Sequence, residues 1–235
     1  MIIGSGMMAR TFAAYADRDD VVVLAAGVAN SRETRPEAFE RETLLVEETI
    51  ASMENQLLIY FSTCSIYDTD SVGTPYVLHK LAIEKLVREQ VANYLLFRLP
   101  QVVGYTSNTT TLVSYLYNSV IAQQPIDVWG NACRYIIDAD DVVRIVSYVV
   151  DNGMFRNNIV NVASRPYLVA ELVKTLEAVT GKMALCTYSD RGSYYAIDTA
   201  GIKPILKELQ IEFGPDYLAS VLSKYCASQQ ANPTK

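Results

Sequence analysis

The amino-acid sequence predicts an α/β fold in which a parallel sheet is flanked by helices. Short runs of branched and aromatic residues, such as 20–26, 57–61 and 94–104, alternate with longer segments of helical spacing. Runs of this length and composition are typical of strands buried within a sheet. Because each intervening helix returns the chain to the same edge of the sheet, the alternation favours parallel pairing.

The chain is long enough to form one domain, or one domain with a small lobe. It has 235 residues, of which 50% are hydrophobic, so it can bury a sizeable core. Its net charge is −6, from 26 acidic and 20 basic residues without a basic block, so we expect no nucleic acid as the main partner. The longest apolar stretches, such as 21–26, are shorter than the ~18 residues needed to cross a bilayer. No signal-like segment opens the chain, and we expect a cytoplasmic protein without a membrane partner.

Cysteine and histidine usage excludes several kinds of site. The four cysteines, Cys64, Cys133, Cys186 and Cys226, are widely spaced and form no CxxC, so we expect free thiols. His79 is the only histidine, which excludes a zinc site built from several histidines and argues against a Ser-His-Asp triad. We expect His79 at the surface or at the rim of a site, and no metal site.

The N-terminus carries a glycine-rich turn between a strand and a helix. Met1–Ile3 is expected as a very short strand, and the GxGxxA sequence 4–9 follows, before a helix that reaches about Tyr15. Such a loop lets backbone N–H groups and a helix N-terminus approach a pyrophosphate closely. The alternative is an ordinary tight turn, but the position between strand and helix favours phosphate binding.

Hydroxyl side chains follow the apolar run 57–61. Ser62, Thr63 and Ser65 stand where a strand of an α/β sheet ends and presents polar groups to a ligand. Their position predicts a ligand site at this edge of the sheet.

A helix is expected to begin directly after these hydroxyls. Thr74 is suited to cap it and Pro75 to occupy its first position, and Leu78 and Leu81 are expected among its inward-facing residues.

Tyr76 and Lys80 are four residues apart in that helix and emerge on one face. A lysine ammonium beside a phenol lowers the pKa of the tyrosine. With the hydroxyl of Thr63 nearby, the pair can donate or accept a proton on a carbonyl or alcohol near neutral pH. The alternative is a solvated helix face.

Several segments together resemble the extended group of short-chain dehydrogenase/reductases, the NAD-dependent epimerases and dehydratases. Residues 63–67 and 76–80 are similar to its hydroxyl strand and YxxxK helix, and 94–104 to its sixth strand with an RxxNxxG-like end. Residues 134–142 resemble its RDFIHVDD element. The resemblance covers Gly4 to about Leu222 and implies a reduced Rossmann-like parallel sheet flanked by helices, with a small C-terminal substrate lobe. We expect a core over 1–165, with 105–126 contributing to the lobe, and the lobe over 166–235.

The resemblance assigns 20–26 to the family's fourth strand and 57–61 to its fifth. The second and third strands, which lie between them and the glycine loop in the family, are then absent. In the family, an acidic residue at a strand end, ~20 residues after the glycines, binds the adenosine ribose. The first candidate at this spacing, Glu33, lies among arginines in a loop and not at a strand end. We therefore expect NAD or NADP to bind weakly, unless Arg10, Arg32 or another subunit covers the adenosine.

The resemblance also implies roles for individual residues. Tyr76 would be the general acid/base, Thr63 would orient the reacting group, and Lys80 would lower the pKa of Tyr76 and hold the nicotinamide ribose. The implied cofactor-binding residues are Gly4, Ser5, Gly6, Met7, Met8, Ala25, Ala26, Gly27, Lys80 and Pro100. The implied substrate-binding residues are Ser65, Gln101, which replaces an asparagine, and Arg134, which would grip a nucleotide diphosphate. The alternative for Arg134 is a solvated ion pair with Asp138 or Asp140.

These residues imply an NAD(P)-dependent epimerase or ketoreductase that acts on a nucleotide-linked sugar. Cys64 and Ser65 stand where the family's 4,6-dehydratases carry acidic residues, so we expect no dehydratase. The alternative is a degenerate family member that binds a nucleotide or sugar nucleotide without redox turnover. The expected partner is a nucleotide-sugar substrate, and the expected assembly a possible homodimer.

Overall fold

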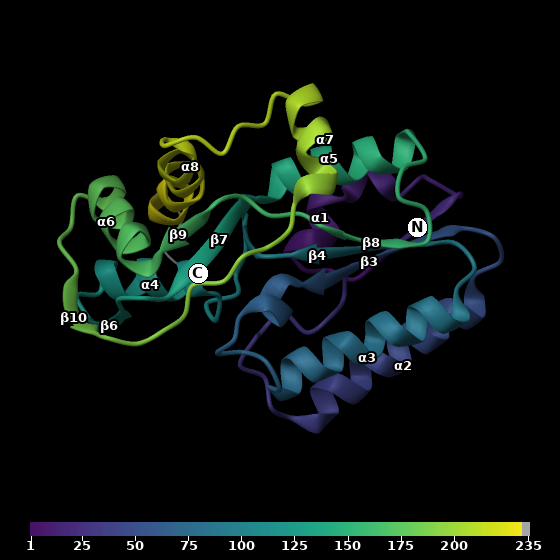
Figure 1. The fold of residues 1–235 in the computed structure, drawn as a ribbon, viewed down its shortest axis with the longest axis horizontal. Coiled ribbons are helices and arrows are strands. Elements are labelled where there is room, and N and C mark those ends of the chain that lie inside the picture. The colour runs from purple at the N-terminus through teal and green to yellow at the C-terminus, as the bar shows by residue number, and fades with distance from the viewer. Residues whose placement is uncertain (232–235) are drawn as a thin grey trace.

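The computed structural model describes residues 1–231 of the chain, and its centre is a five-stranded parallel sheet (Figure 1). The strands are adjacent in the order β1-β2-β3-β4-β8. Their bounds are β1 (Ile2–Ile3), β2 (Val21–Leu24), β3 (Leu57–Thr63), β4 (Tyr94–Leu99) and β8 (Asn158–Asn161). All four pairings are parallel, which confirms the α/β fold predicted from the sequence.

Helices cover both faces of this sheet. In Figure 1, α2 (Pro36–Ser52) and α3 (Pro75–Gln90) lie below it, and α1 (Met7–Thr11), α5 (Ala139–Asp151) and α7 (Lys203–Glu208) lie above it. Successive residues of each strand point to opposite faces, so one set packs under α2 and α3 and the other under α5 and α7. The first set comprises Val22, Leu24, Leu58, Tyr60, Tyr94 and Leu96, and the second Val21, Val23, Leu57, Ile59, Leu95 and Phe97. Burial on both faces explains why the strands read as continuous apolar runs.

The first strand stands at the edge of the sheet. Only α1 and a 3₁₀ helix (Ala13–Tyr15) lie between β1 and β2, and β1 pairs directly with β2 in the residues that are described. In a complete dinucleotide-binding sheet, the first strand is internal, with two further strands beyond it. The expected absence of those two strands is therefore confirmed.

The helix that carries Tyr76 starts where the sequence predicts. The hydroxyl of Thr74 accepts a hydrogen bond from the backbone N–H of Val77, and Pro75 occupies the first turn. The prediction that Leu78 and Leu81 face inward is wrong, because they are 56% and 38% exposed.

The buried stripe of α3 instead contains Tyr76, Lys80, Ile83 and Val87. The helix is rotated so that its polar pair faces the sheet and two leucines face outward.

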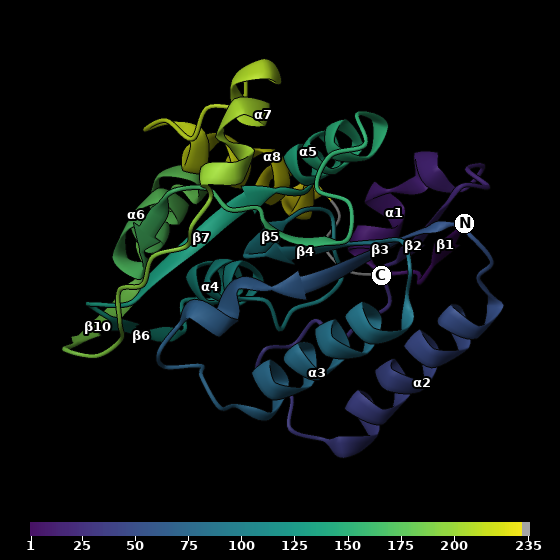
Figure 2. The same ribbon diagram turned by 45° about the vertical axis from the view of Figure 1, so that its right-hand side comes forward.

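A second group of elements forms the lobe at the left of Figure 1 and is seen from another side in Figure 2. It contains a parallel pair, β6 (Pro125–Trp129) with β10 (Leu185–Ser189), and a three-stranded sheet of β5 (Gln101–Val103), β7 (Cys133–Asp138) and β9 (Pro166–Leu168). Three helices pack against these strands: α4 (Leu112–Ile121), α6 (Val169–Thr180) and α8 (Tyr217–Ala231). Gly181 ends α6 with φ +69°, a left-handed conformation that glycine adopts readily. The division at residue 165 stays a prediction.

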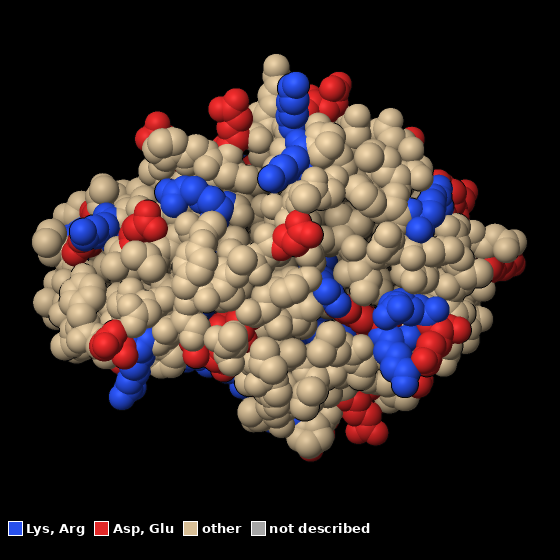
Figure 3. Space-filling model, in the orientation of Figure 1, with Lys and Arg blue, Asp and Glu red and all other residues tan. Residues whose placement is uncertain are grey.

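The surface in Figure 3 shows lysine and arginine side chains interspersed with aspartate and glutamate side chains. No extended basic area is present among the described residues on this face. Within residues 1–231, no helix is long and apolar enough to cross a membrane.

A buried ion pair links α3 to β4. Arg98 donates from Nε and one Nη to the two carboxylate oxygens of Glu84, over 2.9 and 2.6 Å. Ser62 also donates to Glu84, over 2.5 Å, and Glu84 is 3% exposed.

Replacing Arg98 with methionine is expected to lower the free energy of unfolding by about 3–5 kcal/mol, because it leaves the Glu84 carboxylate buried and unpaired. Chemical denaturation measures this loss. The matched control is Lys85→Met on α3, the helix that carries Glu84. The exposed ion pair of Lys85 with Glu89 spans 3.8 Å, and its removal should cost about 0.5 kcal/mol or less. Equal losses in the two variants would contradict the assignment.

Candidate functional site

A large cleft runs along the carboxyl ends of the parallel strands. It has a volume of about 1140 Å³ and is bordered by the loops that follow β1, β2, β3 and β4, together with parts of the lobe. Ligands of open α/β sheets bind at this edge. The cleft brings together all of the site residues expected from the sequence except Gly4 and Ala26: Ser5, Gly6, Met7, Met8, Ala25, Gly27, Thr63, Ser65, Tyr76, Lys80, Pro100, Gln101 and Arg134.

Gly4 lies behind the cleft and allows the glycine loop to pack closely on β2. Its φ is +125°, and a Cβ atom there would lie 2.6 Å from the carbonyl oxygen of Ala25. Gly6 has open space on the side where a Cβ atom would stand. One glycine thus permits the turn, and the other leaves room for a ligand against the backbone.

Thr63 and Ser65 form a small hydroxyl cluster at the end of β3. The Thr63 hydroxyl accepts from the backbone N–H of Ser65 and donates to its Oγ, both over 3.0 Å. Cys64 between them points into the core, donates to the carbonyl oxygen of Arg98, and is 1% exposed. Burial raises the pKa of the Cys64 thiol to about 12.

Tyr76 and Lys80 border the cleft on one face of α3, but they are not hydrogen-bonded to each other in the described structure. The Lys80 ammonium lies 6.0 Å from the centre of the Tyr76 ring. It donates instead to Glu42 Oε1, over 2.8 Å, and to the Tyr60 hydroxyl, over 2.9 Å. The pair expected from the sequence is therefore present in the cleft, with Lys80 anchored by two further residues.

Glu42 and Tyr60 are the residues at this site that the sequence analysis missed. Glu42 is 2% exposed, although its helix is rich in charges. A signal was present in the sequence, because Glu42, Val46 and Thr49 follow the spacing of one helix face, and all three are buried. His79 also contacts Glu42, with Nε2 3.0 Å from Oε2, and its side chain is 8% exposed and does not border the cleft, so it lies beneath the site and not at the surface or rim as expected.

Arg134 reaches the lobe side of the cleft from β7. It donates to the carbonyl oxygen of Cys133 over 2.6 Å, and its guanidinium lies 3.6 Å from the Asp68 carboxylate. The alternative partners considered from the sequence, Asp138 and Asp140, pair with Lys224 instead. An arginine that is partly buried beside a cleft can bind phosphate oxygens in exchange for a carboxylate contact.

The far end of the cleft is bordered by the loop that follows β2. Glu33 is engaged by Arg35, which donates from Nε and Nη2 to its two oxygens over 2.9 and 2.7 Å. Hydrogen bonds from Arg35 lower the pKa of Glu33 to about 2. The Glu33 carboxylate is therefore already hydrogen-bonded within its own loop.

Arg10 joins two loops at the same cleft, because it donates to the carbonyl oxygens of Ser5 and Tyr105 over 2.8 and 3.0 Å.

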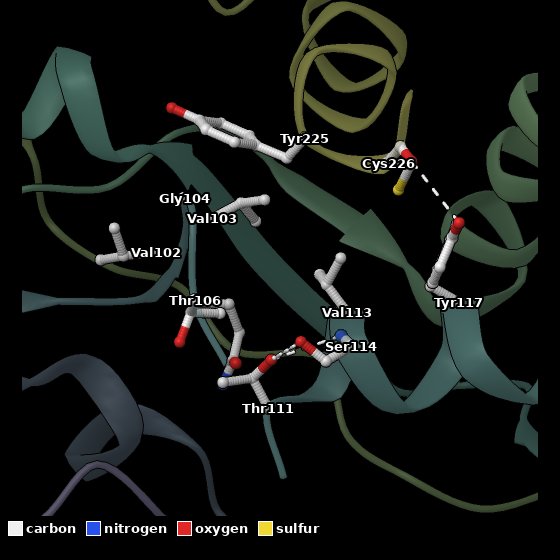
Figure 4. Close-up of a pocket in the computed structure, with 11 residues that line it drawn as sticks. Val102, Val103, Gly104, Thr106, Thr111, Val113, Ser114, Tyr117, Tyr225 and Cys226 are labelled. Carbon is white, nitrogen blue, oxygen red and sulfur yellow. Dashed lines mark hydrogen bonds between the residues drawn. The ribbon is translucent and has the colours of Figure 1, made fainter. Parts of the chain in front are cut away.

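A second, much smaller cavity of about 20 Å³ lies between β5, α4 and α8 (Figure 4). Thr111 and Ser114 are joined there by a hydrogen bond of 2.8 Å, and the Tyr117 hydroxyl donates to the carbonyl oxygen of Cys226 over 3.4 Å. This volume is enough for about one water molecule. The large cleft is therefore the candidate site.

Among the described residues, no group of histidine, cysteine, aspartate or glutamate side chains could hold a metal ion.

Comparison with known proteins points to one family. The sequence model described as "NAD dependent epimerase/dehydratase family" matches residues 5–163. No curated protein matches the chain in sequence.

Solved structures with the same fold include three from bacteria. UDP-glucose 4-epimerase from Thermotoga maritima, with UDP-glucose, is 18% identical with a TM-score of 0.69, over 97% of this chain and 82% of the other. UDP-glucuronic acid 4-epimerase from Bacillus cereus, with UDP-glucuronic acid and NAD, is 18% identical with a TM-score of 0.68, over 89% and 76%. The dTDP-glucose 4,6-dehydratase DesIV from Streptomyces venezuelae, with NAD and TYD, is 16% identical with a TM-score of 0.72, over 91% and 74%. At these identities, the likeness shows a shared fold.

Proposed function

Because the family model matches most of its length, the chain belongs to the NAD dependent epimerase/dehydratase family, and we propose that it is an NAD(P)-dependent epimerase or ketoreductase of a nucleotide-linked sugar. The observation that carries this proposal is that the glycine loop, Thr63, Tyr76, Lys80 and Arg134 all border one large cleft. Of the three solved structures with the same fold, two contain a nucleotide sugar and two contain NAD. This supports the same ligand classes here.

The residues of the cleft fit the nicotinamide half of a dinucleotide better than its adenosine half. Gly6 leaves open space beside the loop, and Lys80 borders the cleft with one N–H free after its bonds to Glu42 and Tyr60. At the adenosine end, Glu33 is engaged by Arg35. We propose that Ser5–Met8 hold the pyrophosphate, Ala25–Gly27 and Pro100 pack on the dinucleotide, and Lys80 binds the nicotinamide ribose.

The chemistry divides between the cofactor and the protein. When bound, a nicotinamide dinucleotide accepts a hydride from a sugar carbon and can return it. Tyr76 takes the proton of the hydroxyl on that carbon, so a carbonyl forms, and gives the proton back when the hydride returns. Thr63 donates its one O–H to Ser65 Oγ, which leaves the Ser65 O–H to donate to the reacting oxygen, so the two hydroxyls orient that oxygen together. Arg134 with Gln101 hold the nucleotide diphosphate and the sugar.

A direct test is incubation of the chain with saturating NAD and a set of UDP-, dTDP- and GDP-linked sugars, followed by NMR of the sugar signals. We expect one sugar nucleotide to convert to its epimer, or to a reduced product when NADH is supplied. Failure to convert any of them, together with binding, would favour the second candidate.

The second candidate is a family member that binds a nucleotide or sugar nucleotide without redox turnover. Two observations favour this candidate, because both weaken the adenosine site. The Glu33 carboxylate is already hydrogen-bonded to Arg35, and β1 stands at the edge of the sheet. Thermal shift and nicotinamide fluorescence with NAD(H) and NADP(H) discriminate the two. An increase in melting temperature with a nucleotide sugar alone, and none with any dinucleotide, would support this candidate.

We expect no 4,6-dehydratase activity. Eliminating water from the sugar requires an acid and a base near the reacting carbon, and Cys64 and Ser65 occupy the positions expected for them. Cys64 is buried with a pKa of about 12, so it cannot exchange protons with a substrate near pH 7. Mass spectrometry of the products measures this directly, and a 4-keto-6-deoxy sugar from any nucleotide hexose would contradict it.

A homodimer and a cytoplasmic location stay predictions from the sequence. Size-exclusion chromatography with light scattering decides the first, and localisation of a tagged chain decides the second.

A further inference from the structure

Four polar side chains form a buried cluster beneath the cleft. Glu42 of α2 accepts hydrogen bonds from the Tyr60 hydroxyl over 2.6 Å, from Lys80 over 2.8 Å and from the backbone N–H of Val28 over 2.7 Å. His79 Nε2 lies 3.0 Å from its second oxygen. Glu42, Tyr60 and Lys80 are each at most 3% exposed.

Glu42 carries a negative charge in this cluster. Burial alone would raise its pKa, but the hydrogen bonds from His79, Lys80 and Tyr60 and the charge of Lys80 hold the pKa well below its ordinary range. The cluster therefore contains a buried ion pair in which the carboxylate receives bonds on both oxygens. Such a pair needs several well-aligned partners to offset its desolvation, and these partners are present.

The geometry of Lys80 links this cluster to the cleft. An ammonium has three N–H donors, and two of them are directed to Glu42 Oε1 and the Tyr60 hydroxyl. A Cβ atom on Gly27, which borders the cleft, would lie 2.6 Å from Glu42 Oε1 and 2.7 Å from Lys80 Nζ. The ion pair of Glu42 and Lys80 thus lies directly beneath the backbone of Gly27. Lys80 itself borders the cleft, so its third N–H can reach a ligand there.

We propose that Glu42, assisted by Tyr60, is a positioning residue that fixes the Lys80 ammonium so that its third N–H binds a ribose hydroxyl of the dinucleotide; this rests on the proposed function, in which Lys80 is the ribose ligand. Glu42 touches neither substrate nor cofactor and acts through Lys80 alone. The flexible four-carbon stem of lysine makes such an anchor effective, because fixing it beforehand reduces the entropy lost on binding.

A double-mutant cycle tests this proposal. The probe is NADH, titrated against the full chain by ligand-observed NMR, which measures millimolar dissociation constants. The variants are Glu42→Gln, Lys80→Met and the double variant, with Tyr60→Phe as a milder change that removes one hydroxyl. Glu84→Gln is the matched control, because Glu84 also forms a buried ion pair on α3, with Arg98, but neither residue borders the cleft.

We expect Glu42→Gln to weaken NADH binding about tenfold, the scale of one charge-assisted hydrogen bond. Lys80→Met should weaken it at least as much, and the double variant no more than Lys80→Met alone. Glu84→Gln should lower the melting temperature and leave the dissociation constant unchanged within about twofold.

The outcomes separate the two proposals. If Lys80→Met leaves NADH binding unchanged, the ribose contact of the proposed function fails, and the role of Glu42 fails with it. If Lys80→Met weakens binding but Glu42→Gln does not, or if Glu42→Gln weakens binding equally in the Lys80→Met background, only the positioning role is overturned. Should Glu42→Gln fail to fold, the cycle of Tyr60→Phe with Lys80→Met decides by the same criteria.

Discussion

Replacement of Tyr76 with phenylalanine is expected to reduce conversion of a nucleotide sugar by about 10²–10⁴-fold, the contribution of one aligned general acid/base. The variant keeps the ring, which is 7% exposed and packs with Val28 and Val77. In the described structure, the Tyr76 hydroxyl makes no hydrogen bond to another side chain, so its loss should leave the melting temperature nearly unchanged.

The rate is measured on the sugar nucleotide identified by NMR, at saturating cofactor. Tyr188→Phe is the control, because Tyr188 is 62% exposed on β10 and does not border the cleft. It should keep the rate of the unmodified chain. Full activity in Tyr76→Phe would show that another group transfers the proton.

Binding of NAD to the isolated chain is expected to be roughly a hundredfold or more weaker than in a family member with the complete sheet. Within residues 1–231, the two strands that would complete the adenosine side are absent, and Glu33 is engaged by Arg35. Each missing hydrogen bond to a charged partner costs about 1.5–3 kcal/mol, so the loss of two accounts for this factor. Discrimination between NAD and NADP should be poor, because no described acidic side chain at this end is free to select the ribose hydroxyls.

Titration calorimetry with NAD and NADP measures both expectations, with a full-length solved epimerase as the reference. Arg10 and Arg32 both border the cleft and are the residues that could cover the adenosine. If the monomer binds NAD with a low micromolar constant, these residues or the loop 27–34 rebuild the adenosine site, and a charge-removing Arg32→Gln variant would then lose that affinity.

The sheet could be predicted from the sequence because its signals are local. The runs that form β2, β3 and β4 are apolar and short, and Thr74 with Pro75 marks the start of α3. The glycine loop, Thr63, Tyr76 and Lys80 follow strand ends, and parallel strands bring such positions to one edge. The short interval between β1 and β2 likewise indicates, from the sequence, that the family's second and third strands with their connecting helix do not fit between them.

Other features depend on packing between distant segments. Leu78 and Leu81 face outward because the polar pair Tyr76 and Lys80 turns toward the sheet, which reverses the usual preference for apolar burial. The spacing of α2 can indicate that Glu42 lies on the buried face, but its pairing with Lys80, 38 residues further along the chain, is recognisable only once α2 lies beside α3. The pairing of Arg134 with Asp68 is likewise set by the meeting of the lobe and the core.

The most direct test of the central claim, that this cleft holds a dinucleotide with its nicotinamide end at Tyr76, is a crystal structure of the chain soaked with NADH and UDP. We predict pyrophosphate density at Ser5–Met8, a nicotinamide ribose within hydrogen-bond distance of Lys80 Nζ, a nicotinamide ring beside Tyr76, and weaker density for the adenosine. A dinucleotide bound outside this cleft, or one whose nicotinamide points away from Tyr76, would contradict the claim.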